Sequence, residues 1–248
     1  MEVTITLPSK GRFYQEAYPD WDGKITFRIL NAGDEQKIFG SSSSSTLDRV
    51  LNSLIIEPAG FDINNLVPGD KNFFMYKVRI ATYGERYKQF YYCPLCNNEG
   101  EIEFSIEEIE VHELDDKIKL PLRIKLPVSG DIIELRVQTC NQINRLEDRA
   151  QKTSKNTGAD YKEIIYALKL AKRIAAVNEK NLDSYEAEKY MREIHPRDRA
   201  YIDSAFKSIK LGYANTLTVN CPKCGKNIVI PFEMNSEFFN PSDEVDCI

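Results

Sequence analysis

The sequence predicts an α+β fold with a mixed α/β N-terminal part, a helical insert, and a ribbon split between two distant segments. Three observations lead to this prediction. Short stretches that alternate apolar and polar residues, as half-buried strands do, occur in the first half and near the end of the chain. A long region with apolar residues at helical spacing separates them. Two C-P-x-C motifs, each flanked by strand-like sequence, define the ribbon.

The first third of the chain contains two alternating segments and the start of a helix. Apolar residues alternate with polar ones in residues 3–7 and again in residues 25–29, which predicts two short strands. Asn31, followed by Asp34 and Glu35, predicts a helix start because acidic residues suit the positive end of a helix.

A run of five serines at residues 41–45 predicts a flexible loop, because serine at this density cannot build a core. Residues 46–54 follow as a short helix. The turn residues Pro68, Gly69 and Asp70 then precede an apolar helix that we expect to end near Gly84.

The middle of the chain predicts two pairs of strands. Residues 85–104 have the pattern strand, knuckle, strand, with the knuckle at Cys93-Pro-Leu-Cys96. Residues 120–126 and 132–137 form the second pair, around a proline- and glycine-containing turn.

The third quarter predicts several helices. Asp160 with Glu163, and Asp183 with Glu186, resemble capping boxes at two helix starts. The apolar stripe of the first of these helices extends to Ile174 and Ala175. His195–Pro196 ends one helix and starts the next, which we expect to stop at Gly212. An earlier helix is predicted from Ile143, Leu146 and Ala150.

These elements divide the chain into three parts. Residues 1–137 form the mixed part with the first knuckle, residues 138–212 the helical insert, and residues 213–248 the second knuckle and a C-terminal tail. The second knuckle, Cys221-Pro-Lys-Cys224, again lies between strand-like segments.

The cysteine spacing predicts a structural zinc site with Cys93, Cys96, Cys221 and Cys224 as its ligands. Zinc prefers four ligands in a tetrahedron, and two residues between cysteines allow one tight turn to direct both thiolates at a single point. Gly225 and Asn97 follow the two knuckles, where a positive φ is often needed. About 125 residues separate the pairs, so the metal would close a long loop and stabilise the fold by several kcal/mol.

A redox dithiol is the alternative interpretation of the cysteine pairs. Redox motifs of this spacing follow a strand and start a helix, which lowers the thiol pKa, whereas strand-like sequence flanks both pairs here. Cys140 is expected to be a buried free thiol on a helix, and Cys247 a loose terminal thiol.

Composition excludes several classes of function. The chain of 248 residues has a net charge of −5, which argues against a general nucleic-acid-binding protein. No apolar run is long enough to cross a bilayer, and the N-terminal residues lack the pattern of a signal peptide.

No catalytic set is evident in the sequence. The two histidines, His112 and His195, are not part of an H-E-x-x-H motif, and we interpret them as belonging to an acidic turn and a helix boundary. Phosphate-binding loops and the G-x-S-x-G motif are absent. The aromatic cluster at residues 87–92 could stack on nucleic-acid bases, but a half-buried strand below the knuckle explains it better.

The order of the motifs resembles the baseplate hub and hub-assembly proteins of contractile-tailed, T-even-like bacteriophages. The resemblance runs nearly from end to end. It rests on Leu7-Pro8-Ser9-Lys10-Gly11 with Tyr14, Gly69–Asp70, Arg79-Ile-Ala-Thr82-Tyr83-Gly84, the two cysteine pairs, Leu126-Pro127-Val-Ser-Gly130 and Phe238-Phe239-Asn-Pro241.

The resemblance implies a non-enzymatic structural component of a tail baseplate hub, or a factor that assists its assembly. It implies contacts with other phage tail proteins and a location in the virion and, during assembly, in the host cytoplasm. No membrane partner is expected, because no apolar run is long enough to cross a bilayer. A zinc-ribbon regulator that binds nucleic acid is the alternative function, and the acidic composition counts against it.

Overall fold

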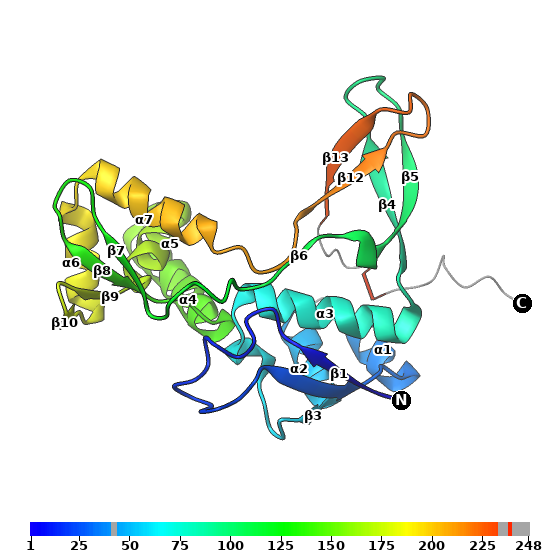
Figure 1. Cartoon of the computed structure of the whole chain (residues 1–248), viewed down its shortest axis with the longest axis horizontal. Helices are drawn as coiled ribbons and strands as arrows, with labels where there is room; N and C mark the ends of the chain where they lie inside the picture. The colour runs from blue at the N-terminus through cyan, green and yellow to red at the C-terminus, as the bar shows by residue number, and fades with distance from the viewer. Residues whose placement is uncertain (41–43, 233–237, 240–248) are drawn as a thin grey trace, which may run out of the picture.

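A computed structural model describes residues 1–40, 44–232 and 238–239 of the chain. Figure 1 shows three regions: an N-terminal lobe (residues 1–83), a helical lobe (residues 120–208), and an arm that projects away from both (residues 86–105 and 216–232). The arm is built from two segments that are far apart in the sequence, coloured green and orange in Figure 1.

The N-terminal lobe packs three helices against a small antiparallel sheet of order β1-β2-β3. Its elements are β1 (Glu2–Thr6), β2 (Lys24–Arg28), α1 (Ala32–Phe39), α2 (Ser44–Leu54), β3 (Ile55–Glu57), the 3₁₀ turn η1 (Ile63–Asn65) and α3 (Pro68–Tyr83). The two predicted strands and the predicted helix start are confirmed. Asn31 caps α1 in a reciprocal capping box with Asp34.

The prediction of a loop over the whole serine run is wrong in part. Ser44 and Ser45 begin α2, and residues 41–43 lie outside the described residues. Serine is favoured at the start of a helix, so a serine run can lead into one when an amphipathic segment follows it.

Helix α3 lies at the centre of the largest core, which extends without a break into the base of the arm. Arg79 is fully buried on α3 and donates hydrogen bonds to the backbone carbonyl oxygens of Gly84 (2.8 Å) and Arg86 (3.1 Å). This side chain therefore joins the end of α3 to the first strand of the arm.

The helical lobe combines four helices with a four-stranded antiparallel sheet of order β10-β9-β8-β7. Its elements are β7 (Leu122–Lys125), β8 (Ile132–Leu135), α4 (Cys140–Thr157), α5 (Tyr161–Lys172), β9 (Ile174–Val177), β10 (Lys180–Asn181), α6 (Ser184–Glu193) and α7 (Pro196–Ser208). Asp183 and Glu186 form the predicted capping box, and His195 is the N-cap of α7 as predicted.

Two sequence predictions for this lobe are wrong. Ile174 and Ala175 belong to β9, because β8 offers an open edge with which Ile174 pairs opposite Leu135. Gly212 does not stop a helix. Helix α7 ends at Ser208, and Gly212 starts the strand β11 (Gly212–Tyr213), which pairs with β6 (Val111–His112).

Strands on both sides of residue 137 share one sheet, and one apolar cluster joins Ile133 and Leu135 to Ile174 and Ile202. The region after residue 137 is therefore less purely helical than expected, because β9 and β10 complete a sheet that begins before it. The three-part division of the chain stays a prediction.

Candidate metal centre

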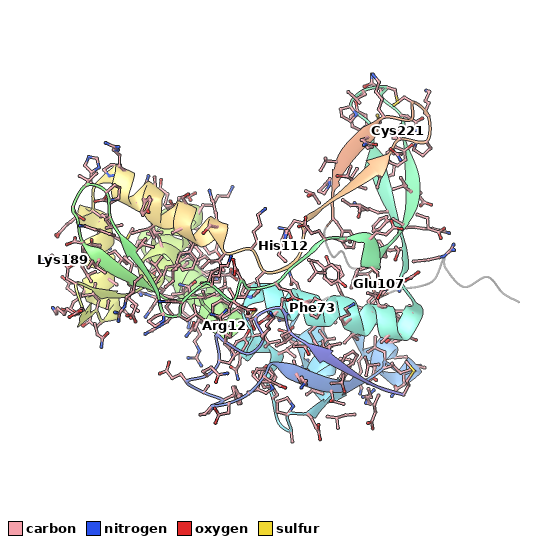
Figure 2. The ribbon with its side chains drawn as sticks, in the orientation of Figure 1. Arg12, Phe73, Glu107, His112, Lys189 and Cys221 are labelled. Carbon is pink, nitrogen blue, oxygen red and sulfur yellow. The ribbon has the colours of Figure 1, made fainter. Side chains whose placement is uncertain are left out.

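The arm consists of two β-hairpins with their cysteine pairs at the same end. One hairpin pairs β4 (Arg86–Tyr92) with β5 (Glu99–Ser105), and the other pairs β12 (Thr216–Asn220) with β13 (Asn227–Pro231). The turn η2 (Ile106–Glu108) follows β5. In Figure 2 Cys221 lies near the tip of the arm, whereas His112 lies near its base.

The two knuckles have the same backbone hydrogen bonds. The N–H of Cys93 donates to the carbonyl of Asn98 (2.8 Å), and the N–H of Asn97 donates back to the carbonyl of Cys93 (2.9 Å). In the second hairpin, the N–H of Cys221 donates to the carbonyl of Lys226 (2.9 Å), and the N–H of Gly225 to that of Cys221 (2.8 Å).

The residue after each second cysteine adopts a positive φ, which is 55° for Asn97 and 68° for Gly225. Both values lie in the left-handed region that asparagine and glycine tolerate best. The prediction that a positive φ is needed after each knuckle is therefore confirmed.

The four sulfur atoms converge at one point. Their Sγ atoms all lie within 4.8 Å of one another, with 3.9 Å between Cys93 and Cys224 and 3.7 Å between Cys96 and Cys221. Four sulfurs held tetrahedrally at 2.3 Å from a zinc ion would be separated by about 3.8 Å. A disulfide needs a separation of about 2.05 Å, and all four thiols are free. The donor set and its geometry therefore fit a tetrahedral metal ion.

The electrostatics of the cluster favour a cation at its centre. Hydrogen bonding from the backbone N–H of Cys224 lowers the pKa of the Cys221 thiol to about 6. Burial, together with hydrogen bonding to the neighbouring sulfurs, raises the pKa of Cys96 to about 12. One thiolate therefore forms readily and opposes the ionisation of the next. A divalent cation would remove this opposition, because it is attracted to all four thiolates at once.

Buried aromatic side chains below the sulfurs hold the hairpins together. Tyr87 and Phe104 from the first hairpin pack edge-on against Phe232, which follows the second. The side-chain amide of Gln89 also donates to the carbonyl oxygen of Pro231 (2.6 Å). The aromatic cluster at residues 87–92 is thus partly a structural support, as predicted, since Tyr87 and Tyr91 are buried.

The sequence did not reveal the contacts that brace the knuckles. The Tyr91 hydroxyl accepts a hydrogen bond from the Asn98 side chain, and the Tyr92 hydroxyl bonds to Asn97. The partners of these two bonds are close together in the sequence, so they could have been anticipated. No sequence pattern connects Gln89 to Pro231.

The remaining singled-out residues lie away from the sulfur cluster. Cys140 is the first residue of α4 and is partly buried, and burial raises its thiol pKa to about 11. His195 caps a helix, as interpreted from the sequence. The interpretation of His112 as part of an acidic turn is wrong, because His112 lies in β6 opposite Gly212, with its Nδ1 3.3 Å from a carboxylate oxygen of Glu110. Cys247 lies outside the described residues. Within the described ranges, the four cysteines are the one group of metal-ligating side chains close enough to share an ion.

Comparison with known proteins identifies a family to which the chain is similar. A family model described as T4 bacteriophage base plate protein matches residues 1–240. No curated protein and no solved structure matches the chain. No helix among the described residues is long and apolar enough to cross a membrane. Because the family model covers almost the whole sequence, the chain belongs to the T4 bacteriophage base plate protein family.

Proposed function

We propose that this protein is a structural component of the phage tail baseplate hub, or a factor that assists hub assembly, and that it acts through protein–protein contacts. The family match carries this proposal, since it supports a location in the virion tail and contacts with other tail proteins. The association with the hub rests on the resemblance of the motifs described above. Assembly of the tail in the host cytoplasm is part of the same proposal.

We also propose that Cys93, Cys96, Cys221 and Cys224 bind one structural zinc ion. The sulfur separations of 3.7 and 3.9 Å support this assignment. Four thiolates would fill the coordination sphere and leave no open position for a substrate, which is the property that separates structural zinc from catalytic zinc. The ion would crosslink residues 131 and 125 positions apart and so hold the two hairpins together as one arm.

A zinc-ribbon regulator that binds nucleic acid is the second candidate. The net charge of −5 counts against it, as do Glu99, Glu101 and Glu103 on alternate positions of β5. The feature that would favour it is the set of basic residues on the arm, Arg86, Lys88, Lys223 and Lys226. A titration with DNA and RNA at low salt tests this candidate, and the proposed function predicts no measurable binding.

Deletion of the protein in the phage that encodes it tests the structural role. The expected result is a loss of complete baseplates, with the protein present in purified tails or in hub precursors isolated before completion. Normal hubs after deletion, together with absence of the protein from both fractions, would contradict the proposal. If the protein is found in hub precursors but not in purified tails, its role is that of an assembly factor and not of a component of the finished hub.

A further inference from the structure

One face of the arm combines exposed aromatic side chains with glutamates. On β4, Tyr87 and Tyr91 point inward, whereas Phe90 and Tyr92 point outward and are 61% and 52% exposed. The antiparallel register places Glu101 opposite Phe90 and Glu99 opposite Tyr92. Directly opposed side chains lie about 5 Å apart at Cβ, so these four residues form one continuous surface. We call it the acidic aromatic face.

The glutamates of this face lack cationic partners. Glu103, the next residue along, pairs with Arg86 at 2.9 Å. Among the described residues, neither Glu99 nor Glu101 forms an ion pair. Lys88, which precedes Phe90 on the same side of β4 and lies opposite Glu103, is the nearest cation in the register of this hairpin, and it forms no ion pair among the described residues. Alternate residues on one side of a strand are about 6.8 Å apart, so Glu99 and Glu101 repel each other without a direct cationic partner.

The acidic character extends along the chain beyond β5. Nine of the 38 acidic residues lie in residues 99–116, a stretch without lysine or arginine. The remainder of the chain therefore has an excess of four basic residues, and the net charge of −5 arises from this one region. Some of these carboxylates are paired, as Glu113 and Asp116 are with Lys10, but those on the acidic aromatic face are not.

The second hairpin provides an internal comparison. Its outward positions are Thr216, Thr218 and Asn220 on β12 and Asn227, Val229 and Pro231 on β13, and none of them is aromatic or charged. The two hairpins share a fold and a knuckle geometry, so the fold does not require aromatic and acidic residues at these positions. Exposed aromatic residues are instead typical of protein interfaces, whose rims are polar.

We propose that the acidic aromatic face is a docking surface for a basic, lysine- or arginine-bearing surface of another tail protein. Phe90 and Tyr92 would supply the apolar contact area, and Glu99 and Glu101 would form ion pairs and set the orientation. The inference deepens the proposed function and rests on it. It does not depend on the identity of the metal.

The test is complementation of an extract from cells infected with a deletion phage, to which purified full-length protein is added. Assembled baseplates are counted after sedimentation. Two double variants probe the face: Phe90→Ser with Tyr92→Ser, and Glu99→Lys with Glu101→Lys. Thr216→Lys with Thr218→Lys is the matched charge control on the other hairpin, and Tyr185→Ser, at a tyrosine 76% exposed on α6, is the matched aromatic control.

We expect each double variant to reduce assembly at least tenfold at limiting protein, and both controls to assemble like wild type. Metal content and circular dichroism of each variant establish that it is folded. The wild-type yield at limiting protein should also fall as salt rises, because ion pairs contribute to docking.

Full assembly by the folded double variants would overturn the docking proposal. Self-association of the wild-type chain that the same variants abolish would also overturn it, because the occupant would then be a second copy. If the extract assembles baseplates without any added protein, the proposed function itself fails, and that result is distinct from both others.

Discussion

A buried hydrogen-bond network accounts for two of the short motifs in the sequence. The Asp70 carboxylate is fully buried near the start of α3. It accepts hydrogen bonds from the Tyr14 hydroxyl (2.6 Å) and from the N–H of Ser9 (3.1 Å). The Tyr14 hydroxyl in turn accepts one from the N–H of Val67 (2.9 Å). The N-terminal loop and α3 are thus fastened together by residues that the sequence showed only as separate motifs.

Removal of the Tyr14 hydroxyl should be strongly destabilising. Tyr14→Phe leaves a buried carboxylate oxygen and the buried N–H of Val67 without their partner, so we expect a loss of about 2–4 kcal/mol in the free energy of unfolding. Urea denaturation measures this loss. Tyr185→Phe, at an exposed hydroxyl, is the control and should change stability by less than about 0.5 kcal/mol. Equal effects of the two substitutions would contradict the network.

Asp70 also predicts a pH dependence of unusual sign. Burial raises the pKa of its carboxyl group, although hydrogen bonds from Ser9 and Tyr14 act against the shift. The folded state therefore holds the proton more tightly than the unfolded state does. The contribution of Asp70 to stability is greatest below the unfolded pKa of about 3.9 and falls as the pH rises through the folded pKa.

Asp70→Asn cannot ionise, so the stability advantage of wild type over this variant should shrink as the pH rises from about 4 towards neutrality. Urea denaturation of both proteins across this range tests the sign, since titration of other groups cancels in the difference. An advantage that is constant or grows with pH would show that Asp70 is not held in a site that favours its neutral form.

At the scale of single elements, local signals predicted most of the fold. The capping residues Asn31 and Asp183, the His195–Pro196 boundary and the alternating strands all lie where the sequence placed them. The two errors at Ile174–Ala175 and at Gly212 share a physical cause. Strand β9 forms because β8 offers it an edge, and β11 because β6 does, and neither partner is visible in the local sequence.

The contact between α3 and β11 depends on two glycines. A Cβ atom on Gly69 would lie 2.4 Å from the carbonyl oxygen of Leu211, and one on Gly212 would lie 2.4 Å from the carbonyl oxygen of Gly69. The backbones therefore approach more closely than any other residue type allows. This explains the Gly69–Asp70 motif and the glycine that the sequence had suggested as a helix stop.

Gly69→Ala should destabilise the protein by roughly 2 kcal/mol or more, although helix propensity alone favours alanine at this position. The control is Gly158→Ala, where a Cβ meets nothing within 4 Å and only the positive φ of 72° has to be accommodated, at a cost of about 1 kcal/mol. Thermal or urea unfolding compares the two. A neutral or stabilising Gly69→Ala would show that the two backbones can move apart freely.

At the scale of the whole molecule, the sequence predicted which cysteines converge, but it did not predict the projecting arm that carries them. The repeated C-P-x-C motif was sufficient because two identical knuckles imply one shared centre. The projecting arm, and the exposure of Phe90 and Tyr92 on it, depend on how two hairpins stack, and the pairing of Gln89 with Pro231 across 142 positions has no sequence signal.

Metal removal should affect the molecule unevenly. The helical lobe has apolar clusters of its own, whereas the arm shares the core of α3 and depends on the knuckles to hold its hairpins together. After chelation we expect faster amide hydrogen exchange in β4, β5, β12 and β13, with little change in the helices α4 to α7. Uniform loss of protection would show instead that the metal stabilises the molecule as a single cooperative unit.

The central claim is that one zinc ion joins the two hairpins, and metal content measured together with reactive thiols tests it most directly. We predict one zinc per chain in the purified protein. Cys93, Cys96, Cys221 and Cys224 should be unreactive before chelation and reactive after it, and Cys140→Ser should leave the zinc content unchanged. Protein without metal, with Cys93 and Cys96 or Cys221 and Cys224 joined as a disulfide, would contradict the claim and favour redox chemistry.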